Sequence, residues 1–154
     1  MRGKQAPKRK IKADPKFSRL DIAKLINKIM LGGKKTIAQS IVYDAFEYIS
    51  DKTKKDPLEI YDAAMRNISP SLEVKGKRIG GANYQVPIVV AGERKTTLAH
   101  RWLIAAAKKR KGAAMSKRLG EELMAAAKGE GEAMKKREDI QRMAEANRAF
   151  AHFA

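Results

Sequence analysis

Apolar residues recur at helical spacing along most of this chain, but over residues 71–91 they alternate with polar neighbours instead. Leu72 and Val74 open this stretch, alternating apolar positions over Tyr84–Val90 close it, and Gly80-Gly81 lies between the two runs. A period of two is typical of strands, and glycines between two such runs predict a β-hairpin. The sequence therefore predicts a mainly α fold, a bundle of about six helices with a two-stranded β-hairpin between the third and fourth helices.

Two loop lengths are possible for this hairpin, and they give different registers. A two-residue loop at Gly80-Gly81 sets Val74 opposite Pro87, whereas a three-residue loop, Gly80–Ala82, sets Val74 opposite Ile88. The three-residue loop makes the base of the hairpin apolar on one face, and a buried face specifies register, so we predict that loop. The outer half of the hairpin carries cations and glycines with nothing to bury, so we expect the ribbon to project.

Local signals predict where several helices begin. Ser18–Asp21 and Thr36–Gln39 have the spacing of capping boxes, and Ser116 precedes the apolar stripe of a fifth helix. Asp56-Pro57 combines a capping side chain with a proline suited to the first turn, and Glu59 is spaced to reach back to the cap. These signals place helix starts near residues 18, 36, 57 and 116.

Charge is concentrated in two blocks of the chain. Residues 1–35 hold 12 basic and 2 acidic residues, and residues 75–118 hold 12 basic and 1 acidic residue. The remaining stretches, 36–74 and 119–154, are slightly acidic, so the blocks account for the whole net charge of +17. In a compact fold the positive charges of two such blocks repel one another unless a counter-charge binds. This distribution favours a nucleic acid as partner over an anionic membrane surface.

The first 16 residues are dense in Lys and Arg, poor in apolar residues and interrupted by Pro7 and Pro15. Such a segment offers too little apolar area to offset its ordering entropy. We therefore expect residues 1–16 to form a basic N-terminal arm and residues 17–154 to form one helical domain.

The sequence lacks the residues that several classes of function require. The chain has no Cys and two His, which excludes disulfides, Cys-ligated zinc and a cysteine nucleophile. Glu121-Glu122 is read as a solvated surface pair, and His100 as a phosphate contact or surface residue. The longest uncharged run, Ile79–Gly92, is too short and too polar to span a membrane, and no secretory signal follows the basic start. Trp102 lies on an apolar stripe, which favours a core anchor over a base-stacking platform.

Five blocks of sequence carry a family resemblance: Asn27-Lys28 with Gly33-Lys34-Lys35, the hairpin from Leu72 to Pro87, Arg101-Trp102-Leu103, Lys135–Asp139 and Arg142–His152. In order and spacing they resemble the bacterial-type small-subunit ribosomal protein seven family, from Asp14-Pro15 to Phe153. The chain departs from the family pattern at Gln141, where a His is usual, and at its Phe153-Ala154 end.

The resemblance implies a structural constituent of the small ribosomal subunit, cytoplasmic, with no enzymatic activity and no cofactor. It implies a primary binder of 16S rRNA that nucleates assembly of the head, the 3′ major domain. It further implies a position near the exit-site tRNA and the mRNA exit path, beside proteins nine and eleven, with no membrane. A free-standing regulator that binds DNA or mRNA is the alternative, and an anionic-lipid-binding protein is a more distant one.

The basic residues of the arm, the turn after the first helix, the hairpin and the later helices are the predicted rRNA contacts. These are Arg2, Lys4, Lys8, Arg9, Lys10, Lys12, Lys28, Lys34, Lys35, Lys75, Lys77, Arg78, Arg94, Lys95, Arg101, Lys108, Lys109, Arg110, Lys111, Lys117, Arg118, Lys135 and Lys136. Phosphate contacts supply affinity and shape supplies specificity. The residues that the resemblance implies near tRNA or mRNA are Arg78, Gly80, Gly81, Asn83, Tyr84, Arg142 and Arg148.

Overall fold

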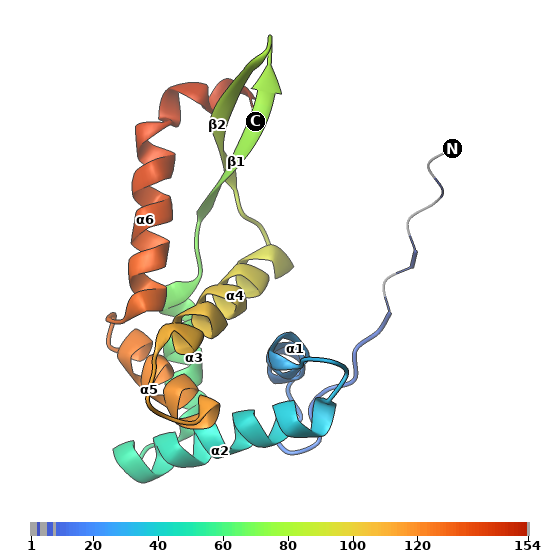
Figure 1. The fold of residues 1–154 in the computed structure, drawn as a ribbon, viewed down its shortest axis with the longest axis vertical. Coiled ribbons are helices and arrows are strands. Elements are labelled where there is room, and N and C mark those ends of the chain that lie inside the picture. Colours follow the sequence, from blue (N-terminus) through green and yellow to red (C-terminus); the bar gives the residue numbers. More distant parts are fainter. Residues whose placement is uncertain (1–2, 4–5, 8, 154) are drawn as a thin grey trace.

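The computed structural model describes residues 3, 6–7 and 9–153. Over these residues the chain forms six α-helices, one two-stranded sheet and a terminal 3₁₀ helix, which confirms the predicted mainly α fold with a hairpin between the third and fourth helices (Figure 1). In chain order the elements are α1 (Leu20–Ile29), α2 (Lys35–Thr53), α3 (Pro57–Ile68), β1 (Leu72–Ile79), β2 (Ala82–Val89), α4 (Glu93–Lys109), α5 (Met115–Ala127), α6 (Glu132–Ala146) and η1 (Arg148–Phe153).

The start of α3 is confirmed, whereas three other predicted caps are wrong. Asp56 accepts a hydrogen bond from the Leu58 N–H at 2.9 Å, and Pro57 takes the first helical position. By contrast α1, α2 and α5 begin after Arg19, Lys34 and Ala114, and none of these residues makes a side-chain cap. A capping motif is a local preference, which the rest of the fold can override.

Arg19 and Asp14 show what replaces the predicted box at the start of α1. Arg19 donates from Nη2 to Asp21 at 2.6 Å and from Nη1 to Asp62 of α3 at 2.9 Å. Asp14 is buried, and its carboxylate accepts from the backbone N–H of Phe17 at 3.1 Å and from the Tyr43 hydroxyl of α2 at 2.7 Å. The entry into α1 is therefore fixed by long-range polar contacts.

Helices α1 to α5 enclose the hydrophobic core, and α6 adds its first turn to it. The largest fully buried apolar side chains come from all five helices: Tyr61, Phe46, Ile22, Leu25, Ile26, Ile49, Ile68, Leu103, Leu119 and Leu123. Helix α5 approaches α2 closely at Gly120, where an added Cβ would lie 2.9 Å from Tyr48 Cδ1 and 3.2 Å from the Ala45 carbonyl oxygen. Gly120 therefore sets how near these two helices can lie.

The hairpin has the two-residue loop, so the predicted three-residue register is wrong. Val74 pairs with Pro87 and Lys75 with Val86 across the antiparallel strands. Gly80 and Gly81 both have positive φ, 57° and 89°, and tight two-residue hairpin turns favour that conformation at both central positions. The glycine pair, rather than the apolar pairing at the base, decides the register.

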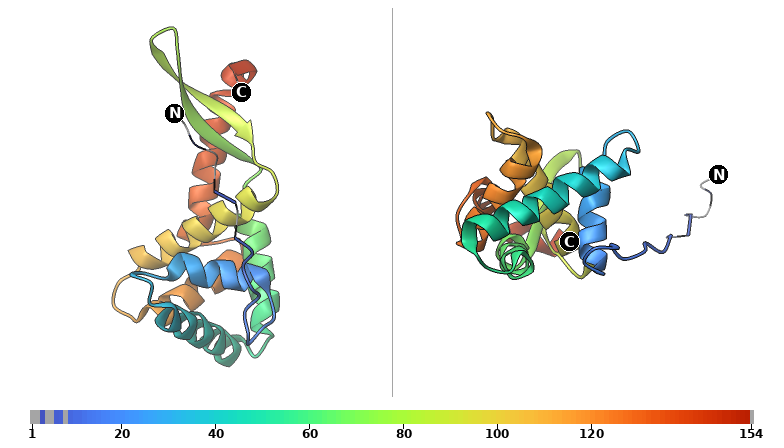
Figure 2. Two further views of the ribbon diagram at one scale, coloured as in Figure 1. Left: turned by 90° about the vertical axis from the view of Figure 1, so that its right-hand side faces the viewer. Right: turned by 90° about the horizontal axis from the view of Figure 1, so that it is seen from below.

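The ribbon does not project alone, as Figures 1 and 2 show. Helix α6 runs beside the ribbon, contacting β1 most closely, and η1 folds against β2. Tyr84 packs its ring 5.1 Å from that of Phe150 and 5.4 Å from that of Phe153, and Lys77 donates to the Phe153 carbonyl at 2.6 Å. The outer half of the hairpin thus buries part of its surface against the C-terminal segment, contrary to prediction.

Candidate nucleic-acid interface

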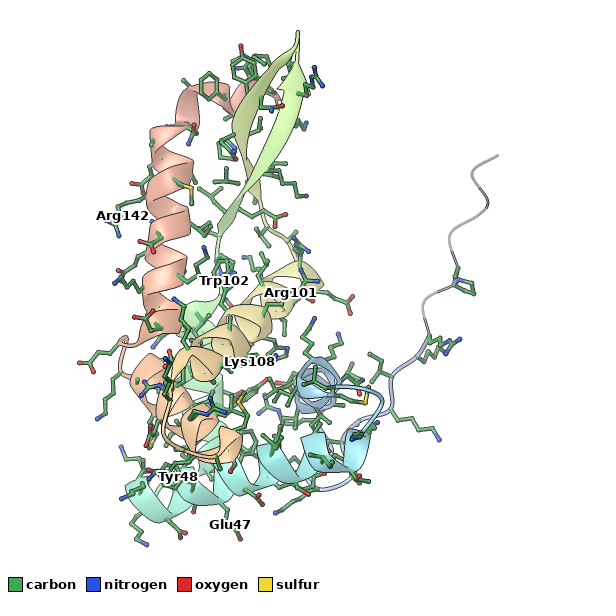
Figure 3. The ribbon with its side chains drawn as sticks, in the orientation of Figure 1. Glu47, Tyr48, Arg101, Trp102, Lys108 and Arg142 are labelled. Carbon is green, nitrogen blue, oxygen red and sulfur yellow. The ribbon has the colours of Figure 1, made fainter. Side chains whose placement is uncertain are left out.

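The two basic blocks of the sequence meet where α1 lies beside α4 (Figure 1). Lys28 of α1 and Arg101 and Lys108 of α4 line an open hollow of about 350 Å³, together with Ile104 and Ala105. Figure 3 shows Arg101 and Lys108 along α4. We call this the α1–α4 hollow. Residues more than 70 positions apart thereby present their cations to one region of the surface.

The electrostatics of the α1–α4 hollow favour an anion. Partial burial lowers the pKa of Lys28, and the positive charges of Arg101, Arg94 and Lys24 lower it further. No ion pair between described residues involves Lys28, Arg101 or Lys108. A bound phosphate would remove this repulsion, because an opposite charge nearby favours the charged form of a lysine.

Other predicted contact residues already have structural partners. Arg94 and Lys75 both pair with Glu73, at 2.9 Å and 3.1 Å. Although burial alone would raise it, hydrogen bonds from these two cations hold the pKa of Glu73 below its ordinary value. Lys109 pairs with Glu132 of α6 at 3.2 Å. These contacts join the ribbon and α6 to the helical body. Their cations therefore stabilise the fold, in addition to any contact that they make with a ligand.

Arg110 and Arg118 hold the loop between α4 and α5. Arg110 pairs with Glu122 at 2.8 Å, and Glu122 is fully buried. Arg118 donates to the Arg110 carbonyl at 2.7 Å, at the end of α4. Both guanidinium groups are therefore committed within the protein.

The remaining predicted contacts in the described part of the chain lie exposed on the surface, and they form several groups. These are Arg9, Lys10 and Lys12 of the arm, Lys34 and Lys35 of the turn after α1, Lys111 of the loop after α4, and Lys95, Lys117, Lys135 and Lys136 of the later helices. Arg2, Lys4 and Lys8 lie outside the described residues. Cations on several faces of the molecule are suited to a partner that surrounds it rather than to a small ligand.

The residues implied near tRNA or mRNA do not form one site. Arg78, Gly80, Gly81 and Asn83 are exposed toward the end of the ribbon, and Tyr84 is half-buried beneath η1. Arg148 is exposed at the start of η1. Arg142 lies part-way along α6, points away from the ribbon in Figure 3 and pairs with Asp139 at 2.8 Å. The ribbon and η1 are brought together, and Arg142 is separate.

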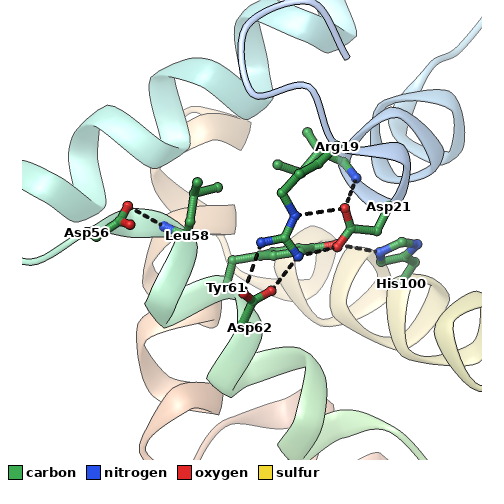
Figure 4. A network of polar contacts seen from close by, with 8 residues as sticks. Arg19, Asp21, Asp56, Leu58, Tyr61, Asp62 and His100 are labelled. Atoms are coloured by element: carbon green, nitrogen blue, oxygen red, sulfur yellow. Dashed lines mark hydrogen bonds and ion pairs between the residues drawn. The ribbon is translucent and has the colours of Figure 1, made fainter. Parts of the chain in front are cut away.

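The surface interpretation of His100 is wrong, as Figure 4 shows. His100 is fully buried between α1 and α3, and its Nε2 lies 2.8 Å from the Tyr61 hydroxyl. Burial, aided by the charge of Lys28, lowers the pKa of His100 to about 4. Burial also raises the pKa of Tyr61. The pair is a neutral buried hydrogen bond with no access to phosphate.

The surface interpretation of Glu122 is wrong as well. Its Oε2 binds Arg110, and its Oε1 accepts the Ala133 N–H in the first turn of α6 at 2.9 Å. A carboxylate at a helix N-terminus satisfies an unpaired backbone donor and interacts favourably with the helix dipole. Glu122 therefore positions α6, while its neighbour Glu121 is partly exposed.

The C-terminal segment was missed by the sequence analysis. Phe150 and Phe153 are three residues apart, and in a 3₁₀ helix such residues lie on the same side. That spacing is the signal that could have identified the contact with the ribbon.

Within the described part of the chain, no helix combines the length and apolar character needed to cross a bilayer.

Comparison with known proteins gives a consistent family. The profile of the family described as Ribosomal protein S7p/S5e matches residues 1–148. Small ribosomal subunit protein uS7 of Thermotoga maritima is 56% identical over 153 residues, covering 99% of both chains. The uS7 protein of Polynucleobacter necessarius is 55% identical over 152 residues, covering 99% of this chain and 97% of its own, and that of Burkholderia cenocepacia gives the same values.

Together with the hairpin, the helical body and the dense cations, these matches over nearly the whole length leave one assignment. The chain belongs to the S7p/S5e family of ribosomal proteins, whose members are structural and non-enzymatic.

Proposed function

We propose that this protein is a structural constituent of the small ribosomal subunit that binds 16S rRNA directly and nucleates assembly of the head, its 3′ major domain. The observation that carries the proposal is the α1–α4 hollow, where Lys28, Arg101 and Lys108 come together without acidic partners among the described residues. A folded RNA supplies phosphates at fixed spacing, and such contacts give affinity while the fit of shapes gives specificity.

The ribbon and η1 form the second part of the proposal. Arg78 and Asn83 near the end of the ribbon and Arg148 at the start of η1 are exposed polar groups on a scaffold held by aromatic contacts. They support a position near the exit-site tRNA and the mRNA exit path. Neighbouring proteins nine and eleven are the expected protein partners, and the expected location is the cytoplasm, within the subunit.

Salt-dependent binding of the full chain to 3′-major-domain RNA tests the rRNA proposal. We expect tighter binding to this RNA than to random duplex DNA of equal length at roughly 0.2 M salt. Equal affinity for both would reject specific rRNA binding and favour the regulator alternative.

A triple variant tests the α1–α4 hollow itself. Lys28→Gln, Arg101→Gln and Lys108→Gln together should lower the slope of log affinity against log salt by about 2–3, because each lost phosphate contact removes part of the counterion release. The matched control is Lys54→Gln, Lys55→Gln and Lys128→Gln, three exposed lysines at the ends of α2 and α5. Equal losses in both triples would mean that total charge, rather than this hollow, determines binding.

A further inference from the structure

A second hollow lies between α4 and α6, around the indole of Trp102. It has a volume of about 200 Å³ and is lined by Trp102, Ala105, Ala106 and Lys109 of α4 and by Glu132 and Lys136 of α6. We call it the indole hollow. Its α4 residues follow the spacing i, i+3, i+4 and i+7, so they form one face of that helix. Two of the lining residues beside Trp102 on this face are alanines, and no ring contact between described residues involves the indole.

The indole ring is only partly committed to the core. Trp102 packs against the core but stays half-buried. Its Nε1 makes no hydrogen bond to any described residue and is not among the buried unpaired atoms, so it reaches solvent. A half-buried indole has a rigid apolar face and a free donor, which is the combination that stacks on a planar polar ring.

The rim of the indole hollow is positively charged. Lys109 has 73% of its side chain exposed while it pairs with Glu132, which neutralises the one acidic group of the lining. Lys136 is exposed on the α6 side, and Lys135, also exposed, precedes it on the same helix. An occupant that is apolar and flat in its centre and anionic at its edge would match this surface.

The indole hollow adjoins the α1–α4 hollow. Ala105 lines both hollows. Of two consecutive lysines, Lys108 lines the α1–α4 hollow and Lys109 lines the indole hollow. A strand of nucleic acid whose phosphates contact Lys28, Arg101 and Lys108 would therefore pass beside Trp102. A helix about 10 Å in diameter is too large for a space of this volume, whereas a single base is not.

We propose that Trp102 is a stacking platform for one unpaired base of the bound RNA, with Lys109 and Lys136 contacting the phosphates that flank it. The inference rests on the proposed rRNA binding and adds to it a contact with a base. Stacking on an aromatic side chain tolerates any base, because each has a π-face, so the subsite selects for an unpaired nucleotide rather than for its identity.

Intrinsic fluorescence tests the inference directly, because Trp102 is the one tryptophan of the sequence. We expect saturable quenching of its emission by 3′-major-domain RNA, with the midpoint given by an independent filter-binding titration. Heparin, a polyanion without bases, should bind the cations and leave the emission unchanged. Unchanged emission with RNA that binds at full affinity would overturn the stacking and leave rRNA binding intact. Equal quenching by heparin would also overturn it, and failure to bind RNA would instead reject the proposed function.

Two kinds of variant make the test quantitative. Trp102→Phe should keep affinity within about fivefold, and Trp102→Leu should lose roughly five- to a hundredfold, the range for one base–aromatic stack. Ala105→Leu fills the indole hollow without altering the indole, and it should abolish quenching. Because Ala105 also lines the α1–α4 hollow, weaker RNA binding is expected from either change, and the loss of quenching is the specific readout. Ala146→Leu, at an exposed alanine at the end of α6, is its control. Full affinity and full quenching in Ala105→Leu would overturn the inference even if Trp102→Leu fails to fold.

Discussion

Aromatic side chains occupy different surroundings in the helical body and in the ribbon. In the body, Phe46 and Tyr61 are at most 1% exposed, and their ring centroids lie 5.7 Å apart within the common core. Beside the ribbon, Tyr84, Phe150 and Phe153 make rings of similar spacing but stay half-buried. On the ribbon itself, Val89 is 76% exposed. The body is held by full burial of apolar area, whereas the outer half of the ribbon is held by contacts at a surface. Further along β2, away from the turn, Val86 is fully buried.

The largest expected effect compares the same substitution in both regions. Phe46→Ala should lower the free energy of unfolding by about 3–5 kcal/mol, because it opens a cavity in a closed core. Phe150→Ala should cost less than about 1 kcal/mol, because its surroundings are open to water and can relax. Urea denaturation of both variants measures the difference. Equal losses would show that the ribbon and the body share one cooperative core.

Two neighbouring glutamates sharpen the comparison at the joint between body and α6. Glu122→Ala should cost about 3 kcal/mol, because it breaks a buried ion pair and frees the Ala133 N–H. Glu121→Ala should cost less than about 1 kcal/mol, because Glu121 is 35% exposed and its contact with Arg110 is 3.6 Å long. The same denaturation experiment applies. A large loss of stability in Glu121→Ala would contradict this assignment, because it would show that Glu121 also stabilises the joint.

A pH titration separates buried from exposed histidine. The folded protein binds a proton at His100 only near pH 4, whereas the unfolded chain does so near 6.5. Between these values the unfolded state holds more protons, so stability should fall as pH falls through this window, by up to about 3 kcal/mol, and this group adds no further loss below it.

The titration needs variants of both histidines. His100→Gln should flatten the stability curve between pH 6.5 and 4, while His152→Gln, at an exposed residue in η1, should leave it unchanged. Stability of the unmodified protein that stays level across this window would contradict the buried neutral histidine.

The smallest expected effect on global stability comes from the ribbon itself. Replacing residues 77–84 with Asn-Gly retains the pairing of Gly76 with Gln85 and removes Tyr84. The melting temperature of the body should hold within a few degrees, while amide exchange over Arg148–Phe153 should become fast, because η1 loses its aromatic contact. Slow exchange there after trimming would show that α6 alone orders η1.

Sequence reasoning located the elements better than it located their partners. The Asp56-Pro57 start of α3 was predictable because a capping side chain and a proline act within one turn. The hairpin was predictable because period two and a glycine pair are local signals. The register was wrong because apolar pairing at the base was weighed above the turn, and the positive φ of both glycines decided otherwise.

The candidate site was likewise predictable only in part. That cations would gather was predictable from two basic blocks, but which cations stay free was not. Arg110 and Lys108 are two residues apart in one basic run; the first binds the buried Glu122, and the second lines the α1–α4 hollow. Only the neighbouring helices distinguish them, because a charge run carries no information on the carboxylate that approaches it from elsewhere in the chain.

The sequence by itself determined the helical body, the hairpin and the large positive charge of this protein, because spacing, turn residues and composition act over a few residues. Tertiary structure alone decided that Lys28 meets Arg101, that His100 and Glu122 are buried, and that Phe150 and Phe153 cover Tyr84. Those outcomes depend on how helices pack, and packing sums contacts between residues far apart in the chain, which no local pattern encodes.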